Sequence, residues 1–217
     1  MQREDSETRR GNRFWPAVHA VFSLPLLRRW ICWRGRRNGK KVAITFDDGP
    51  NPHTTPHVLR ILRESGVRCT FFVLGREAAK HPYMLTPIAA SGHEIGLHGY
   101  DHTGREFREQ IRRCERELGR HVTCAGLFRP AMGRRGACHI PWLCLRGYTT
   151  VLWTFDAFDS MRHEGKHTAA PDYDRIRAGD IVLMHDDNPV CVAELLALIE
   201  SLRKRGLQPT TVSDLIA

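Results

Sequence analysis

The stretch that decides the fold lies at residues 41–50 and reads KVAITFDDGP. Residues 42–46 form a short run of mainly apolar and β-branched side chains, and such a run predicts a buried strand. The run ends at Asp47, where the sequence Asp-Asp-Gly-Pro supplies residues that favour a tight turn. Taken alone, this turn has a purely structural explanation.

Six further strand-like runs follow, and helical patterns alternate with them. The predicted strands lie at 69–74, 94–97, 123–128, 148–153, 180–184 and 207–212, and the predicted helices at 53–65, 78–90, 105–118 and 195–202. Alternation of this kind is typical of an α/β domain with a mainly parallel sheet or an incomplete (β/α) barrel. The longest segment without a clear pattern is 160–172.

The net charge of +9 is distributed unevenly along the 217 residues. Residues 1–41 contain 11 Lys and Arg against 3 Asp and Glu, a net charge of +8. Residues 42–217 contain 22 basic against 21 acidic residues, a net charge of +1. A nearly neutral body offers no basic face, so we do not expect a nucleic-acid partner. We predict a basic amphipathic N-terminal arm at 1–40 and a catalytic domain at 41–217.

The arm interleaves Trp, Phe and Leu with arginine over residues 14–34, and two prolines and a histidine interrupt its apolar run. The run is too short to span a membrane, but its composition suits contact with an anionic membrane surface. The alternative is an extension that packs its apolar residues on the domain. The arm lacks the order of features that marks a secretory signal.

The chain has seven cysteines, an odd number, and no CxxC pair. This favours reduced thiols over a disulfide framework, and with it a cytoplasmic position or one peripheral to the membrane.

Residues that carry chemistry follow successive predicted strands. Asp47 and Asp48 follow the first, His98 and His102 the third, Arg129 the fourth, Asp156 and Asp159 the fifth, and His185 the sixth. In parallel α/β folds, functional groups collect at the carboxyl ends of strands. Each residue alone has an ordinary explanation, but their common placement at strand ends is improbable by chance.

The residue types fit a hydrolytic metal site. Two imidazoles and one carboxylate bind a divalent metal such as zinc and leave positions for water and substrate. One of the two adjacent aspartates can bind the metal while its neighbour acts as a base. A histidine suits the role of proton donor near neutral pH.

Five ordered motifs resemble those of the polysaccharide deacetylase family, also called carbohydrate esterase family 4 or the NodB-homology domain. They are residues 45–50 (TFDDGP), the pair His98 and His102, Arg129-Pro130, the pair Asp156 and Asp159, and residues 183–185 (LMH). The resemblance runs from about residue 41 to the C-terminus, and its first two motifs are specific together. It implies a distorted, incomplete (β/α) barrel of about seven parallel strands in a single domain.

The resemblance also implies a role for each site residue. Asp48, His98 and His102 would hold a divalent metal, zinc in our prediction. Asp47 would be the general base, kept ionised by Arg129, and His185 the general acid, oriented by Asp159. A backbone N–H near Met132 would stabilise the oxyanion. The implied reaction is metal-dependent hydrolysis of an N-acetyl group on an amino sugar, in an oligosaccharide, a polysaccharide or a sugar conjugate.

Two motifs depart from the family pattern. Ala131 and Met132 stand where the family usually has proline and an aromatic residue, and Ser160 stands where it often has tryptophan. Both changes affect the predicted substrate pocket and not the metal ligands. They therefore bear on the choice of sugar or acyl group, and a bulkier acyl group or a lipid-linked sugar is one hypothesis.

Two rival interpretations remain. Residues 163–167 (HEGKH) match the zinc protease signature H-E-x-x-H, but a glycine lies inside the motif and no apolar periodicity supports a helix. We expect a charged loop at the rim of the site. The second rival is a catalytically silent sugar-binding or membrane-associated module of the same fold. The complete set of predicted ligands, base and acid argues against it, and the altered motifs argue for it.

Overall fold

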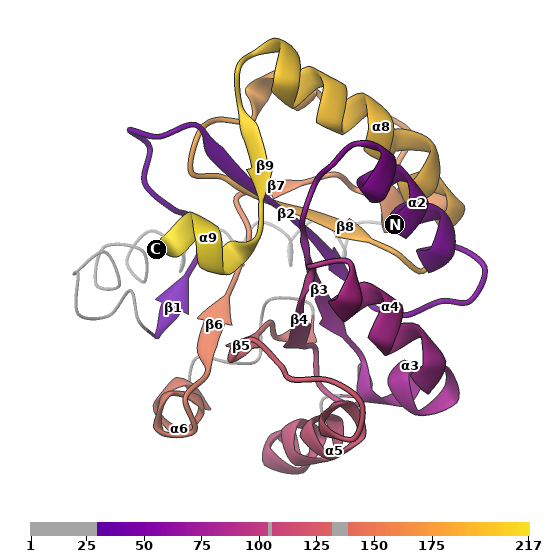
Figure 1. Ribbon diagram of the computed structural model, residues 1–217, viewed down its shortest axis with the longest axis vertical. Helices are drawn as coiled ribbons and strands as arrows, with labels where there is room; N and C mark the ends of the chain where they lie inside the picture. The colour runs from indigo at the N-terminus through magenta and orange to yellow at the C-terminus, as the bar shows by residue number, and fades with distance from the viewer. Residues whose placement is uncertain (1–29, 104–105, 132–138) are drawn as a thin grey trace, which may run out of the picture.

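The computed structural model describes residues 30–103, 106–131 and 139–217, and within them nine strands form one sheet. The strands are β1 (Ile31–Cys32), β2 (Lys41–Asp47), β3 (Thr70–Val73), β4 (Glu94–Leu97), β5 (Leu127–Phe128), β6 (Thr149–Val151), β7 (Phe155–Asp156), β8 (Ile181–His185) and β9 (Gln208–Thr210). Their order is β1-β6-β5-β4-β3-β2-β8-β7, with β9 beside the start of β2, and every pairing is parallel. The sheet curls into a half-barrel (Figure 1).

The helices are α2 (Thr55–Glu64), α3 (Gly75–Lys80), α4 (Leu85–Ala90), α5 (Phe107–Gly119), α6 (Ile140–Leu145), α7 (Asp159–His163), α8 (Pro189–Lys204) and α9 (Val212–Ile216). Most of them lie around the outside of the curled sheet (Figure 1). Helix α9 lies within the curl instead, and its Val212 and Leu215 belong to the same buried cluster as Ala43 and Phe72 of the strands. Short 3₁₀ turns lie at Pro82–Met84 and Tyr173–Arg175.

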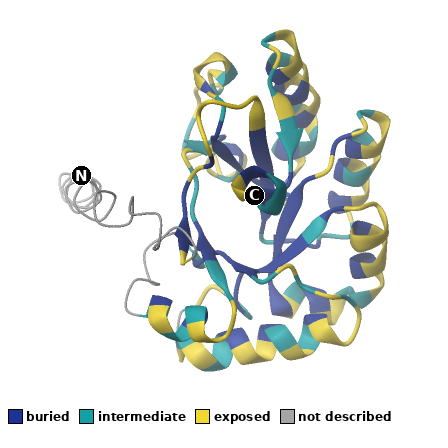
Figure 2. Cartoon of the chain, turned by 60° about the vertical axis from the view of Figure 1, so that its left-hand side comes forward, coloured by how far each residue is buried: buried dark blue, intermediate teal, exposed yellow. Residues whose placement is uncertain are grey.

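Burial follows the sequence pattern of each element. Every residue of β2 after Lys41 is buried, because the strand lies in the middle of the sheet and both of its faces are covered. Helix α5 buries only Ile111, Cys114 and Leu118, which share one face at helical spacing. Figure 2 shows buried residues concentrated on the strands and exposed residues on the outer sides of the helices.

The predicted α/β half-barrel is confirmed, with differences of detail. Strands β1 and β7 have two residues each and were not predicted, because so short a run leaves no pattern to detect. The helix predicted at 78–90 is two helices, since Pro82 starts a separate turn between them. The segment at 160–172 is not wholly irregular, because α7 occupies its beginning.

The predicted arm falls mostly on residues 1–29, which lie outside the described residues. Of the remainder, Ile31 and Cys32 form β1 at the edge of the sheet, beside β6. Across the three described ranges, no helix is both long and apolar enough to cross a membrane. The division at residue 40 stays a prediction.

Candidate functional site

The predicted site residues lie together at the carboxyl edge of the sheet. Asp47 is the last residue of β2 and is paired in register with His185, the last residue of β8. Leu97, the last residue of β4, precedes His98, and its carbonyl accepts a hydrogen bond from the backbone N–H of Arg129. Parallel strands therefore carry residues that are far apart in the chain to one edge.

Asp48, His98 and His102 form a group that can hold a metal ion. Their ligand atoms lie within 4.8 Å of one another. Asp48 Oδ1 is 2.7 Å from His102 Nε2 and 3.3 Å from His98 Nε2. Even so, this buried oxygen accepts no hydrogen bond of acceptable direction within the described part of the chain. Ligand atoms that converge without directed hydrogen bonds fit a divalent metal site.

His98 is oriented for this role by its other ring nitrogen. Its Nδ1 lies 2.9 Å from the carbonyl oxygen of Arg129, so the Nδ1–H donates to that carbonyl and Nε2 keeps its lone pair. His98 is buried, whereas the side chain of His102 is 42% exposed. The site thus has one rigid imidazole and one that faces solvent.

Asp48 is held in a strained backbone conformation. Its φ of 74° lies in the left-handed region, which costs a non-glycine residue on the order of 1–3 kcal/mol. Although burial raises the pKa of Asp48, the two histidines lower it further, and the result is well below the usual range. The carboxylate is therefore ionised and available as a ligand.

Asp47 and Arg129 form a buried ion pair. Asp47 Oδ1 lies 2.7 Å from Arg129 Nη1, and neither side chain is more than 4% exposed. Burial lowers the pKa of Arg129, and Asp47 opposes this effect. The other carboxylate oxygen of Asp47 lies 3.7 Å from His98 Nε2, which places it beside the candidate metal ligands.

His185 and Asp159 form a second pair on the opposite side of Asp47. Asp159 is fully buried and accepts hydrogen bonds from Nδ1 and from the backbone N–H of His185, at 3.0 and 2.9 Å. Burial lowers the pKa of His185, but the Asp159 carboxylate raises it more, to about 10. His185 is therefore protonated near neutral pH, and Nδ1 is committed to Asp159.

Sequence reasoning missed a buried carboxylate behind the Asp48 turn. Asp186 is fully buried, accepts a hydrogen bond from Thr55 Oγ1, and its carbonyl accepts one from Thr54 Oγ1. Burial raises the pKa of Asp186 to about 7. A Cβ added to Gly49 would come within 2.3 Å of both carboxylate oxygens. Asp186 thus supports the turn that carries Asp48. The one signal for this residue in the sequence is its position directly after His185.

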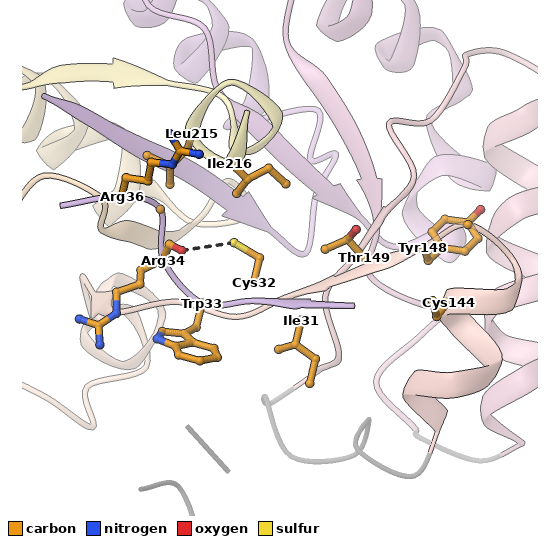
Figure 3. Close-up of a pocket in the computed structure, with 12 residues that line it drawn as sticks. Ile31, Cys32, Trp33, Arg34, Arg36, Cys144, Tyr148, Thr149, Leu215 and Ile216 are labelled. Atoms are coloured by element: carbon orange, nitrogen blue, oxygen red, sulfur yellow. Dashed lines mark hydrogen bonds between the residues drawn. The ribbon is translucent and has the colours of Figure 1, made fainter. Parts of the chain in front are cut away.

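Two cavities adjoin His102. One of about 480 Å³ is lined by Asp48, His53 and Arg76, and one of about 150 Å³ is lined by His98, Phe128 and others. A separate cavity of about 470 Å³ lies between β1, α9 and the turn before β6, and it includes none of the predicted site residues (Figure 3).

The two altered motifs are only partly visible. Ala131 lines the smaller cavity beside His98, while Met132 and its backbone N–H lie outside the described residues. Ser160 is half-buried at the start of α7. The expected loss of an aromatic wall at residue 132 therefore remains a prediction.

The protease interpretation of residues 163–167 is wrong. Helix α7 ends at His163, and Gly165 has a φ of 70°, which no helix interior contains. His163 and His167 therefore do not share a helix face, as that mechanism requires.

The fold and the site together define a metal-dependent hydrolase built on a parallel half-barrel. The polysaccharide deacetylase family model matches residues 34–140. A peptidoglycan-N-acetylglucosamine deacetylase of Bacillus cereus is 32% identical, over 86% of this chain and 93% of that protein. A chitooligosaccharide deacetylase of Azorhizobium caulinodans is 33% identical, over 70% of this chain and 77% of that protein.

Solved structures agree with this assignment. The Bc1960 peptidoglycan N-acetylglucosamine deacetylase superposes with a TM-score of 0.78 at 28% identity, over 88% of this chain and 94% of that one. A mutant of a carbohydrate esterase family 4 pseudoenzyme with restored activity superposes with a TM-score of 0.74 at 26% identity. The match covers 86% of this chain and 71% of that one. The chain belongs to the polysaccharide deacetylase family, and its activity is that of a carbohydrate N-deacetylase.

The support of the Asp48 turn by Asp186 makes a prediction about Gly49. Gly49→Ala forces a methyl group against a buried carboxylate, and such overpacking costs about 1–3 kcal/mol of unfolding free energy. We also expect weaker binding of divalent metal, because the turn carries a ligand. Urea unfolding and metal titration measure the two effects.

Gly119→Ala is the matched control. A Cβ added there meets nothing within 4 Å, so the change should alter the unfolding free energy by no more than about 1 kcal/mol. If Gly49→Ala and Gly119→Ala had equal unfolding free energies and equal metal affinities, Asp186 would not constrain the turn.

Proposed function

We propose that this protein uses zinc to remove the acetyl group from N-acetylglucosamine units of an oligosaccharide or polysaccharide. The observation that carries the proposal is the meeting of three arrangements at one sheet edge. These are a carboxylate paired with a buried arginine, a group of three metal ligands, and a protonated histidine held by a carboxylate. The substrates named for the related enzymes support the choice of sugar.

Asp47 is the proposed general base. Its carboxylate lies beside the candidate ligands and is paired with Arg129, which places it to take a proton from water. The hydrogen bond from Arg129 also fixes the direction of Oδ1, so the free oxygen Oδ2 is the one available for proton transfer.

Asp48, His98 and His102 would hold a divalent ion, which would supply polarisation of the acyl carbonyl and a water molecule of lowered pKa. We assign zinc because two imidazole nitrogens and one carboxylate oxygen form a donor set typical of catalytic zinc.

His185 is the proposed general acid. Protonated at neutral pH, it can donate from Nε2 to the nitrogen of the departing amine while Nδ1–H stays bonded to Asp159. Asp47 and His185 lie opposite each other in the β2–β8 register, which suits groups that act on the two sides of one acyl carbon.

A catalytically silent module of the same fold is the alternative. The pseudoenzyme among the structural relatives is a member of the same family, so the fold alone does not decide between the two. The complete base, ligand and acid arrangement in this chain favours the enzyme.

Acetate release tests the activity and the base together. Zinc-loaded protein should release acetate from N-acetylglucosamine oligomers, and chelation should stop the release. Asp47→Asn should lower kcat by about 10²–10⁴-fold, because it removes the proton acceptor. Zinc titration of the variant is the control, since Asp47 is not one of the three ligands. Metal-independent release, or full activity of the variant, would contradict the proposal.

The pH profile tests the acid. His185 must be protonated to act, so activity should persist on the alkaline side until about pH 10 and fall above it. Asp159→Asn removes the charge that raises this pKa and leaves the lowering by burial, so the alkaline limb should move to lower pH. Asp174→Asn is the control, because that side chain is 79% exposed. If the alkaline side of the activity profile of Asp159→Asn lay at the same pH as in the unchanged protein, His185 would be excluded as the acid.

We also propose that residues 1–40 bring the protein to an anionic membrane surface, from a cytoplasmic or peripheral position. The basic and aromatic composition supports this, and Trp30, where the described structure begins, is 36% exposed. Ile31 and Trp33 are buried in the domain, so the proposed contact falls to the residues up to Trp30. The protein should bind vesicles that contain phosphatidylserine and not neutral ones. The double substitution Arg28→Gln and Arg29→Gln should weaken binding about 30-fold, at about 1 kcal/mol per arginine. Equal binding to neutral vesicles would contradict it.

A further inference from the structure

Phe158 combines an exposed aromatic ring with an unfavourable backbone conformation. Its φ of 54° lies in the left-handed region, which bulky side chains rarely adopt. The residue is nevertheless 38% exposed. Since an apolar ring stabilises a fold through burial, core packing does not account for a strained backbone that presents this ring to solvent.

Two contacts hold Phe158 in place, one to its backbone and one to its ring. The backbone N–H of Phe158 donates to Asp156 Oδ1 at 2.8 Å. The ring of His167 stacks against it, with centroids 4.9 Å apart and planes 4° apart. Nδ1 of His167 is buried and has no hydrogen-bond partner among the described residues, so the stacking contact and not a bond to this atom sets the ring orientation.

The turn after α7 explains how His167 reaches Phe158. Gly165 has a φ of 70°, and its N–H donates to the carbonyl of Arg162. The N–H of Lys166 then donates to the carbonyl of Met161. This pair of bonds is the Schellman arrangement that ends a helix at a left-handed glycine, and it reverses the chain. The residues of the HEGKH segment therefore support the residue that precedes the helix.

The stacked pair borders the proposed acid. Asp159, the neighbour of Phe158 in the chain, holds His185 Nδ1 at 3.0 Å. Asp156, two residues before Phe158, ends β7 in register with Leu183 of β8, the strand that ends at His185. Phe158 therefore belongs to the rim of the site and not to a distant surface.

We propose that the exposed face of Phe158, backed by His167, binds the ring of a sugar unit that flanks the unit being deacetylated. This proposal rests on the proposed function. The C–H groups on the face of a β-linked N-acetylglucosamine ring pack well on the electron-rich face of an aromatic ring. The hydroxyl groups at the sugar edge stay in water, which an exposed ring permits and a buried one does not. Phe158 is thus a residue for binding chains of sugars, and it does not take part in the chemical step.

The test compares affinity and turnover for sugars of different length. Phe158→Leu keeps an apolar side chain but removes the aromatic face, and it should raise the KM for a pentamer of N-acetylglucosamine by about three- to tenfold. Phe158→Trp should keep the KM near that of the unchanged protein. His167→Ala removes the support without altering residue 158 and should also raise the KM. In all three, kcat and the hydrolysis of 4-nitrophenyl acetate, which has no flanking sugar, should stay within about twofold.

Binding measured by calorimetry keeps the two proposals separable. Pentamer affinity is determined with Asp47→Asn protein, with and without Phe158→Leu, so that turnover is not needed. Leu196→Ala is the control, because this residue is also exposed and apolar but lies on α8.

Equal pentamer affinity with and without Phe158→Leu would overturn the proposed sugar-binding role of Phe158 while leaving the proposed deacetylase activity intact. A loss of kcat or a moved alkaline limb with unchanged affinity would also overturn it, because Phe158 would then act through Asp159. If no sugar releases acetate, the proposed function fails and the binding result still decides the sugar-binding role of Phe158.

Discussion

The guanidinium of Arg129 lies inside the molecule with no exposure to solvent, and the rest of the site depends on how its charge is neutralised. Burial of an unpaired charge costs several kcal/mol, so Arg129 is tolerated only where its donors find acceptors. Asp47 and Thr45 Oγ1, both on β2, each lie 2.7 Å from Nη1. Since β4 and β3 separate β5 from β2 in the sheet, this ion pair reaches across the inside of the curl. It therefore ties the residue that follows β5 to the end of β2, the strand that carries the proposed base beside the candidate metal ligands.

The same edge holds carboxylates in different electrostatic states. Asp47 is paired with a cation, Asp159 has a lowered pKa because His185 donates to it, and burial raises the pKa of Asp186 to about 7. Asp159 can remain ionised beside the reacting groups, while Asp186 lies behind the turn, away from them. Because each carboxylate has its own partner, the site can keep a base and an acid in opposite protonation states at one pH. This separation is a property of tertiary contacts, and no single element of the fold produces it.

The amino-acid sequence was sufficient to predict the alternation of strands and helices and the placement of chemistry at strand ends. Both follow from local periodicity and from the rule that parallel strands share one carboxyl edge. The sequence could not predict the two-residue strands β1 and β7, which only pairing with long-range neighbours defines. Nor could it predict the support of the Asp48 turn, because Asp186 and Thr55 are 131 residues apart in the chain. The stack of Phe158 on His167 was hidden for a further reason: Gly165, which argued against a helix in the sequence, forms the turn that brings His167 to Phe158.

Backbone strain within the described ranges bears on the choice between an enzyme and a silent module. Three non-glycine residues there have positive φ, and two of them, Asp48 and Phe158, belong to the candidate site. A buried ion pair is often no more stabilising than apolar residues of the same volume. Stability of the fold alone therefore does not explain the pairing of Asp47 with Arg129. A module that only had to fold and to adhere to sugar would keep Phe158, but it could lose the strain at Asp48 and the buried ion pair and gain stability. Strained and buried polar groups persist where function requires them, and here they surround the residues proposed for metal binding and proton transfer. The altered residues Ala131 and Ser160 are neither the proposed base and acid nor the proposed ligands, so they do not argue against a retained reaction.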